Sequence, residues 1–136
     1  MIVSKKEATP ATITPEKTVA PKGVCIVDDN PEIRNVYAAI LKARGHRVVL
    51  TASSGEEIMS EPFRSKLRYI DVVIMDYLMG PMNGLQAAAA VLEYNPKIKM
   101  IIASGEDEIE NEISISGLAY LRKPFSRSDV LRLIEE

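Results

Sequence analysis

Short apolar segments that alternate with longer amphipathic ones constrain the fold of this chain more than any other feature of its sequence. Each short segment is rich in β-branched residues, which is typical of strands, and each stops at a polar residue. The longer segments repeat their apolar residues with the period of a helix; in the first of them these are Ile33, Val36, Tyr37, Ile40 and Leu41. The predicted strands are residues 23–27, 47–52, 70–75, 98–103 and 118–121, and the predicted helices are residues 31–45, 54–67, 84–94 and 106–115 with a last helix from Ser126.

Five strands that alternate with five helices predict an α/β fold with a doubly wound, five-stranded parallel sheet. The expected strand order is 2-1-3-4-5, as in flavodoxin-like folds. The chain has 136 residues, of which 46% are hydrophobic and 26% charged, and these values suit one domain with a buried core.

Local signals set the expected helix boundaries. Asn30 is a suitable N-cap for the first helix, and Gly45 is expected to end it in a left-handed conformation. Pro62 is expected to end or kink the second helix because it has no backbone N–H group. Ser126 and Asp129 have the spacing of a capping box at the start of the last helix.

The first 21 residues differ in composition and periodicity from the rest of the chain. They contain three prolines and show no strand or helix period, which predicts a disordered or loosely tethered tail before a domain at residues 22–136. Residues 1–22 carry four lysines against two glutamates, whereas the remainder carries 17 acidic and 13 basic residues.

Composition excludes several classes of function. No apolar run reaches the ~18 residues of a membrane span, and the single cysteine and single histidine cannot form a disulfide framework or a zinc cluster. A net charge of −2 offers no basic surface for nucleic acid. We therefore expect a cytoplasmic domain that binds neither membrane nor nucleic acid directly.

Chemically active residue types stand where the predicted strands end. Asp28 and Asp29 follow the first strand, Asp76 the third, Ser104 the fourth and Lys123 the fifth. Taken alone, each of these residues is common in a turn, at a helix cap or on the surface. Parallel strands end at one edge, however, and three close carboxylates need a cation, for which Mg²⁺ with a phosphate group is suitable. Aspartate can also act as a nucleophile toward phosphoryl groups.

With these residues in this order, the chain resembles the receiver domain of two-component response regulators over about residues 22–136. The matching motifs are Asp28-Asp29, Met75-Asp76, Ala103-Ser104-Gly105 and Lys123-Pro124-Phe125, with Tyr120 three residues before the lysine.

The resemblance implies that Asp76 accepts a phosphoryl group from the phosphohistidine of a sensor histidine kinase or phosphotransfer protein. It further implies that Mg²⁺ is bound directly by Asp29 and Asp76, through water by Asp28, and by the backbone carbonyl of Leu78. Ser104 and Lys123 would contact phosphoryl oxygens. The domain would promote its own phosphotransfer and dephosphorylation without turning over a separate substrate.

The resemblance also implies a switch. Tyr120 would turn inward as Ser104 shifts, and the surface formed by the fourth helix, fifth strand and last helix would then change for a downstream protein or output domain. A cis peptide bond before Pro124 is expected on the same grounds.

Several features depart from the family pattern. Gly80-Pro81 reverses the usual order of proline and glycine in the loop after Asp76, which puts the position of the Leu78 carbonyl in question. The stretch between Ser104 and Lys123 is shorter than usual, and residues 106–112 include five acids, so we expect a short, frayed fourth helix that does not support a regular dimer.

Two other functions compete with a phosphorylated receiver. One is a pseudo-receiver that binds partners without phosphorylation, against which the intact set of acids, serine and lysine argues. The other is a small Mg²⁺-dependent phosphatase, which would need a second acid two residues after Asp76, where this chain has Leu78.

Overall fold

The computed structural model describes residues 19–136, and they fold around a five-stranded parallel sheet with the order β2-β1-β3-β4-β5. This order is the one predicted from the sequence. The strands are β1 (Gly23–Val27), β2 (Arg47–Ala52), β3 (Val72–Asp76), β4 (Lys99–Ser104) and β5 (Ala119–Arg122). Most of the predicted tail, residues 1–21, lies outside the described residues.

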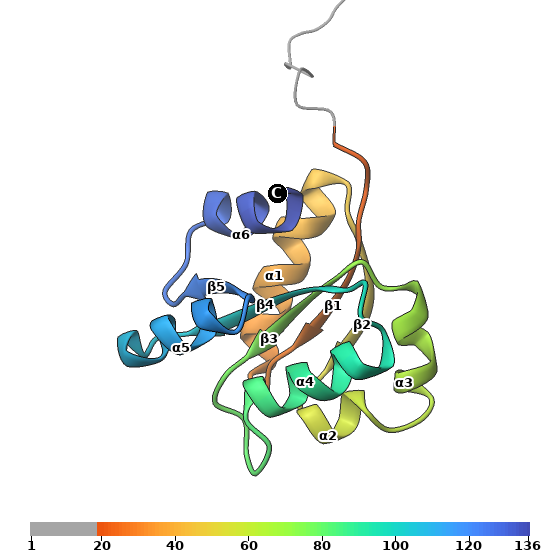
Figure 1. Ribbon diagram of the computed structural model, residues 1–136. Coiled ribbons are helices and arrows are strands. Elements are labelled where there is room, and N and C mark those ends of the chain that lie inside the picture. The colour runs from red at the N-terminus through yellow and green to blue at the C-terminus, as the bar shows by residue number, and fades with distance from the viewer. Residues whose placement is uncertain (1–18) are drawn as a thin grey trace, which may run out of the picture.

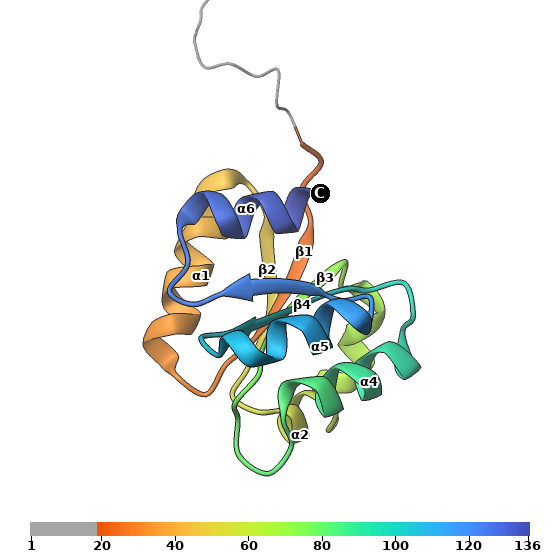
Figure 2. The ribbon, with the colours of Figure 1, turned by 60° about the vertical axis from the view of Figure 1, so that its left-hand side comes forward.

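Helices cover both faces of the sheet (Figures 1 and 2). One face carries α1 and α6, and the other carries the remaining helices. The helices are α1 (Pro31–Arg44), α2 (Gly55–Ile58), α3 (Phe63–Lys66), α4 (Gly84–Tyr94), α5 (Glu110–Ile115) and α6 (Arg127–Glu135), with 3₁₀ turns η2 (Leu67–Tyr69) and η3 (Asp107–Ile109). None of the helices within residues 19–136 is long and apolar enough to cross a membrane.

The sheet separates two hydrophobic cores. Strand residues alternate between them, so that Ile26 and Ile74 face α1 and α6, whereas Cys25 and Met75 face α2 to α5. Strands β1 and β3 are buried on both faces, which explains their unbroken apolar sequences.

The capping predictions are confirmed. The Asn30 side chain accepts hydrogen bonds from the first turn of α1, and Gly45 ends that helix with φ = 98°. Ser126 and Asp129 form the expected capping box on α6.

The helix predicted at residues 54–67 is interrupted before Pro62, as expected of this proline, and is not a single element. It is replaced by α2, α3 and η2, and the chain between α2 and α3 contains Pro62, whose missing N–H cannot continue a helical ladder. Strand β3 starts at Val72 and not at residue 70. Ile70 is held by a turn hydrogen bond to Leu67, and the Asp71 carboxylate accepts the backbone N–H of Gly23 at 2.7 Å.

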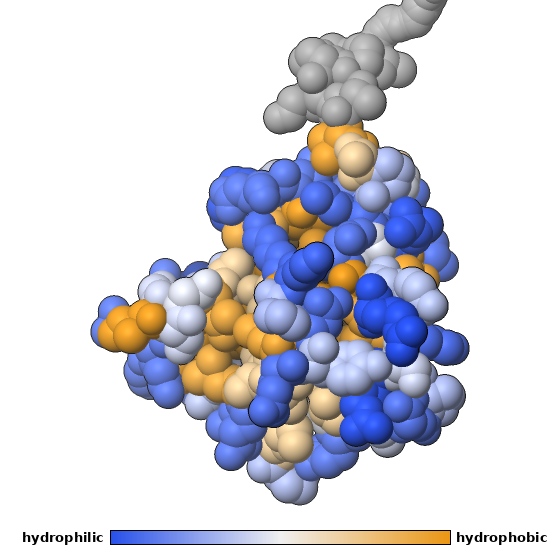
Figure 3. Space-filling model, turned by 45° about the vertical axis from the view of Figure 1, so that its right-hand side comes forward, coloured by the Kyte–Doolittle hydropathy of each residue, from blue (hydrophilic) through white to orange (hydrophobic). Residues whose placement is uncertain are grey.

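Helix α5 is as short as predicted, with six residues after η3. Only Ile109 and Ile113 of this segment are buried, and Ile115 at its end is 77% exposed. Hydrophobic surface lies between the protruding α5 and α4 (Figure 3), in a recess of about 510 Å³ that includes Leu92 and Leu118. This recess lies at the edge where the strands begin, away from Asp76.

Candidate functional site

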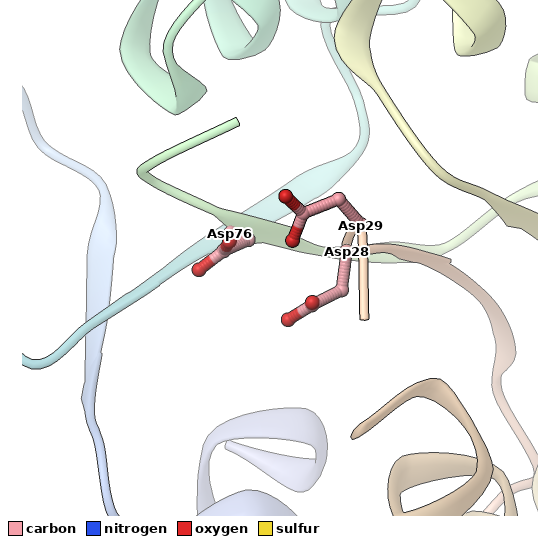
Figure 4. A group of neighbouring side chains, drawn as sticks. All are labelled: Asp28, Asp29 and Asp76. Carbon is pink, nitrogen blue, oxygen red and sulfur yellow. The ribbon is translucent and has the colours of Figure 1, made fainter. Parts of the chain in front are cut away.

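Three aspartates come together at the edge of the sheet where β1 and β3 end. Asp28 and Asp29 follow β1, and Asp76 is the last residue of β3. The two strands pair with Val27 opposite Met75, so their register brings the acid pair beside Asp76. One carboxylate oxygen from each aspartate lies within 4.8 Å of the others, and Figure 4 shows the three side chains grouped at the strand ends.

Asp28 is the most enclosed of the three acids, with 1% of its surface exposed. Its Oδ1 atom accepts the backbone N–H of Asn30 at 2.9 Å, and its Oδ2 atom accepts a hydrogen bond from Lys123 Nζ at 3.1 Å. The guanidinium of Arg34 donates to the Asp28 carbonyl oxygen at 2.6 Å. Donors on three sides therefore fix this residue in one orientation.

Lys123 links two of the acids. Its ammonium group also donates to Asp76 Oδ1 at 2.8 Å. Burial opposes the charge of Lys123, but the hydrogen bonds and charges of Asp76 and Asp28 outweigh it and raise the pKa of the lysine. The Lys123–Pro124 peptide bond is cis, as predicted.

The acid cluster retains excess negative charge in spite of this lysine. Burial raises the pKa of Asp76; the hydrogen bond from Lys123 lowers it, but the charges of Asp28 and Asp29 raise it further. One ammonium group facing three carboxylates leaves the cluster net negative. Closely grouped carboxylate oxygens with excess charge are suitable ligands for a hard divalent cation, so the donor set fits the Mg²⁺ implied by the sequence.

Ser104 and Tyr120 are connected at the ends of β4 and β5. Ser104 is buried, and its hydroxyl accepts the backbone N–H of Glu106 at 3.0 Å. The Tyr120 hydroxyl donates to the Ser104 carbonyl oxygen at 3.1 Å, and the backbone N–H of Lys123 donates to the same oxygen at 2.9 Å. Any movement of the Ser104 peptide must therefore disturb Tyr120 and Lys123 together.

Comparison with known proteins identifies the family. A family model described as the response regulator receiver domain matches residues 24–135. The chain belongs to this family. Receiver domains are the signalling domains of two-component systems, and phosphorylation and Mg²⁺ binding are typical of them.

Curated relatives include receiver proteins of different lengths. The chain is 32% identical over 124 residues to the transcriptional regulatory protein PdtaR of Mycobacterium tuberculosis, covering 90% of this chain but only 59% of PdtaR. It is also 32% identical over 118 residues to the chemotaxis protein CheY of Treponema pallidum, covering 85% of this chain and 81% of that protein.

Solved structures share the receiver fold. A chain of the CheX-CheY-BeF3-Mg²⁺ complex from Borrelia burgdorferi superposes with a TM-score of 0.75 at 26% identity, covering 87% of this chain and 90% of that chain. A response regulator receiver domain from Clostridium thermocellum superposes with a TM-score of 0.73 at 28% identity, covering 83% and 90%.

The loop after Asp76 contains the departure noted in this receiver domain's sequence. Gly80 has φ = 56°, a conformation that glycine adopts readily and that other residues rarely do. The Leu78 side chain is 56% exposed, and Met79 is buried against the core. None of the hydrogen bonds among the described residues ties the Leu78 carbonyl to the acids, so its role as a metal ligand stays a prediction.

Sequence reasoning missed two contributors to the receiver site. Tyr37 was counted only as part of the apolar face of α1, yet its ring stacks on Phe125 with 4.7 Å between ring centroids. Arg34, which holds the Asp28 carbonyl, comes three residues before Tyr37 in the same helix and gave no signal beyond its position six residues after the acid.

Proposed function

We propose that this chain is a phosphorylated receiver that accepts a phosphoryl group on Asp76 from a sensor histidine kinase or phosphotransfer protein, in a Mg²⁺-dependent reaction. The observation that carries the proposal is the arrangement of three carboxylates within 4.8 Å of one another around a lysine ammonium 2.8 Å from Asp76. A pseudo-receiver would have no need for this group of mutually repelling acids.

The proposed reaction uses the side chains of the site in distinct ways. An Asp76 carboxylate oxygen forms the new bond to phosphorus while the bond from phosphorus to the histidine nitrogen of the donor breaks. Lys123, already in contact with Asp76, turns to neutralise a phosphoryl oxygen, and Ser104 donates its hydroxyl to another. Asp28, Asp29, Asp76 and the Leu78 carbonyl would hold Mg²⁺, which when bound offsets the negative charge that gathers in the transition state.

The proposed output follows from the hydrogen bonds of Ser104. When Ser104 shifts toward the phosphoryl group and its peptide moves with it, Tyr120 loses or changes its contact with the Ser104 carbonyl. The surface of α5, β5 and α6 then changes for a downstream protein or output domain in the cytoplasm, without direct binding to nucleic acid. The acids of η3 and α5 would favour a partner with a basic surface. We place the functional receiver unit at residues 22–136.

Phosphorylation is tested by intact mass after incubation with Mg²⁺ and acetyl phosphate. The wild-type protein should gain one phosphoryl group, and Asp76→Asn should gain none. Asp107→Asn, which removes an exposed carboxylate paired with Arg122, is the matched control and should react like the wild type. A folded wild-type protein that gains no mass would support the pseudo-receiver, and a modified Asp76→Asn variant would disprove the assignment of the acceptor.

Metal binding is tested separately by NMR titration with Mg²⁺. Shifts should concentrate at residues 28, 29 and 76, and Asp29→Ala should remove them while the fold is kept, because Asp29 is exposed. A titration without shifts at these strand ends would contradict the metal site.

A further inference from the structure

Asp29 is the least restrained of the three aspartates. It is exposed, and none of the hydrogen bonds and ion pairs within residues 19–136 holds its carboxylate. One of its oxygens nevertheless lies within 4.8 Å of those of Asp28 and Asp76 (Figure 4). The direction of this side chain is therefore set by the backbone from which it projects.

The peptide group between Asp28 and Asp29 is held at its oxygen by Arg34. Asp28 lies just beyond β1, where its N–H still donates to the Ala52 carbonyl at 3.1 Å, but its own carbonyl accepts no backbone N–H of the described residues. Arg34 Nη1 donates to that carbonyl oxygen at 2.6 Å. Because only 1% of Asp28 is exposed, water cannot readily replace this donor, and a buried carbonyl needs a partner.

The guanidinium of Arg34 is bound to a neutral oxygen and not to an acid. It takes part in none of the ion pairs within residues 19–136, although three carboxylates lie at the same edge of the sheet. A hydrogen bond from an ionised donor is roughly twice as strong as one between neutral groups. Arg34 projects from α1, which is capped by Asn30 and anchored in the core by Tyr37 and Leu41. The hydrogen bond therefore ties the segment that carries two of the acids to a rigid helix.

We propose that Arg34 is a positioning residue for the divalent cation, because by holding the peptide between Asp28 and Asp29 it keeps the Asp29 carboxylate beside Asp76. Without Arg34, Asp28 would keep the hydrogen bonds to its two carboxylate oxygens and from its N–H, so the loss falls mainly on Asp29. The inference rests on the proposed function for the metal that occupies the site.

The charge of Arg34 and its positioning role predict opposite effects on metal affinity. A cation close to the acids repels Mg²⁺, so removal of the charge alone would strengthen binding. Loss of the preferred position of Asp29 would weaken it. Arg34→Met keeps a long aliphatic side chain without a donor, and it should raise the Kd for Mg²⁺ about tenfold, as is typical when a residue that orients a metal ligand is removed.

NMR titration of the unphosphorylated protein with Mg²⁺ measures this affinity. Lys42→Met removes an exposed charge from the same helix and is the matched control; its Kd should stay within about twofold of the wild type because solvent and salt screen that charge. An unchanged or lower Kd in Arg34→Met would overturn the inference and leave the metal site in place. A wild type without shifts at residues 28, 29 and 76 would disprove the metal site and the inference with it.

Backbone dynamics provide a readout without metal. In EDTA, the ¹⁵N order parameter of Asp29 should fall from about 0.85, the value of rigid backbone, to below about 0.6 in Arg34→Met, and it should not change in Lys42→Met. An unchanged order parameter in Arg34→Met would contradict the positioning role. If that variant does not fold, Arg34→Gln replaces it, because glutamine is uncharged and too short to reach the same carbonyl, and the same results are expected.

Phosphorylation by acetyl phosphate separates positioning from a general loss of structure. The Mg²⁺ concentration that gives half the maximal rate should rise about tenfold in Arg34→Met, whereas the rate at saturating Mg²⁺ should stay within about twofold of the wild type. A slower reaction with an unchanged half-saturating concentration would overturn the inference. If the wild type binds Mg²⁺ but is not phosphorylated, the proposed function fails, and the titration still decides the role of Arg34.

Discussion

Substitution of Gly84 by alanine should destabilise the domain and impair phosphorylation, although helix propensity alone predicts the opposite. Gly84 is the first residue of α4, and replacing glycine by alanine in a helix is usually favourable by up to ~1 kcal/mol. A Cβ atom at this position, however, would lie 2.5 Å from the Asp76 carbonyl oxygen and 2.8 Å from the Tyr77 Cα atom. Both are backbone atoms, so no side-chain rotation can relieve the clash.

The expected magnitude follows from these opposing effects. Overpacking at a rigid site costs ~1–3 kcal/mol, and the backbone neighbours here put the cost at the upper end of that range. After the gain in propensity, a net loss of about 2 kcal/mol remains, which lowers the melting temperature of a domain of this size by about 8 °C. Relief of the clash must move the backbone of Asp76, so phosphorylation should slow roughly tenfold.

Urea and thermal unfolding followed by circular dichroism measure the stability change, and intact mass measures phosphorylation. Gly105→Ala is the matched stability control, because its Cβ atom would meet the Lys123 carbonyl oxygen at an ordinary 3.5 Å. It should stay within about 0.5 kcal/mol of the wild type. A Gly84→Ala variant as stable as the wild type would refute the reasoning.

Three further predictions concern charge and packing. Burial and the charges of Asp28 and Asp29 raise the pKa of Asp76 above its ordinary value, although the Lys123 hydrogen bond lowers it, so the contribution of Asp76 to stability is complete at low pH and is lost as pH rises through the folded-state pKa. In EDTA near neutral pH, Asp76→Asn should therefore melt at a higher temperature than the wild type. A difference in melting temperature that does not shrink on acidification would contradict this. Hydrogen bonds and charge from Arg44 and His46 lower the pKa of Glu135 despite partial burial, so the contribution of Glu135 to stability is present at neutral pH and is lost as pH falls through the folded-state pKa. Melting curves should show Glu135→Gln to be less stable than the wild type near neutral pH and equal to it in acid. Ile113→Ala removes a fully buried anchor of α5 and should cost ~2–4 kcal/mol in urea unfolding; a smaller loss together with unchanged amide exchange in α5 would show that this helix does not depend on it.

The sequence predicted the strand order and the acid cluster because both depend on regular geometry. Parallel strands bring their carboxyl ends to one edge, and the alternation of apolar segments located β1 and β3 closely enough to place Asp28 and Asp29 next to Asp76. The cap residues Asn30 and Gly45 act through their immediate neighbours, so local sequence was sufficient for them.

Contacts between distant segments could not be predicted in the same way. The ring stack of Tyr37 on Phe125 depends on how α1 packs beside the loop after β5, which no local pattern encodes. The position of Lys123 at the edge with the aspartates was predicted, but not that one ammonium group bonds to both Asp28 and Asp76. The break between α2 and α3 was underestimated for a related reason. Pro62 indicated a disturbance, but the separate helices and the turn after them are stabilised by tertiary packing of residues such as Ile58 and Leu67.

Because the Lys123 ammonium group already joins Asp28 and Asp76, folding of this domain does not depend on a bound metal ion. A counterion that belongs to the chain cannot be removed by chelation or diluted away. The newly made domain can therefore reach its native state when divalent ions are scarce, with its carboxylates already partly neutralised. Magnesium bound as proposed would compete with this internal cation for the same oxygens, and its apparent affinity would depend on how readily the Lys123 side chain moves away.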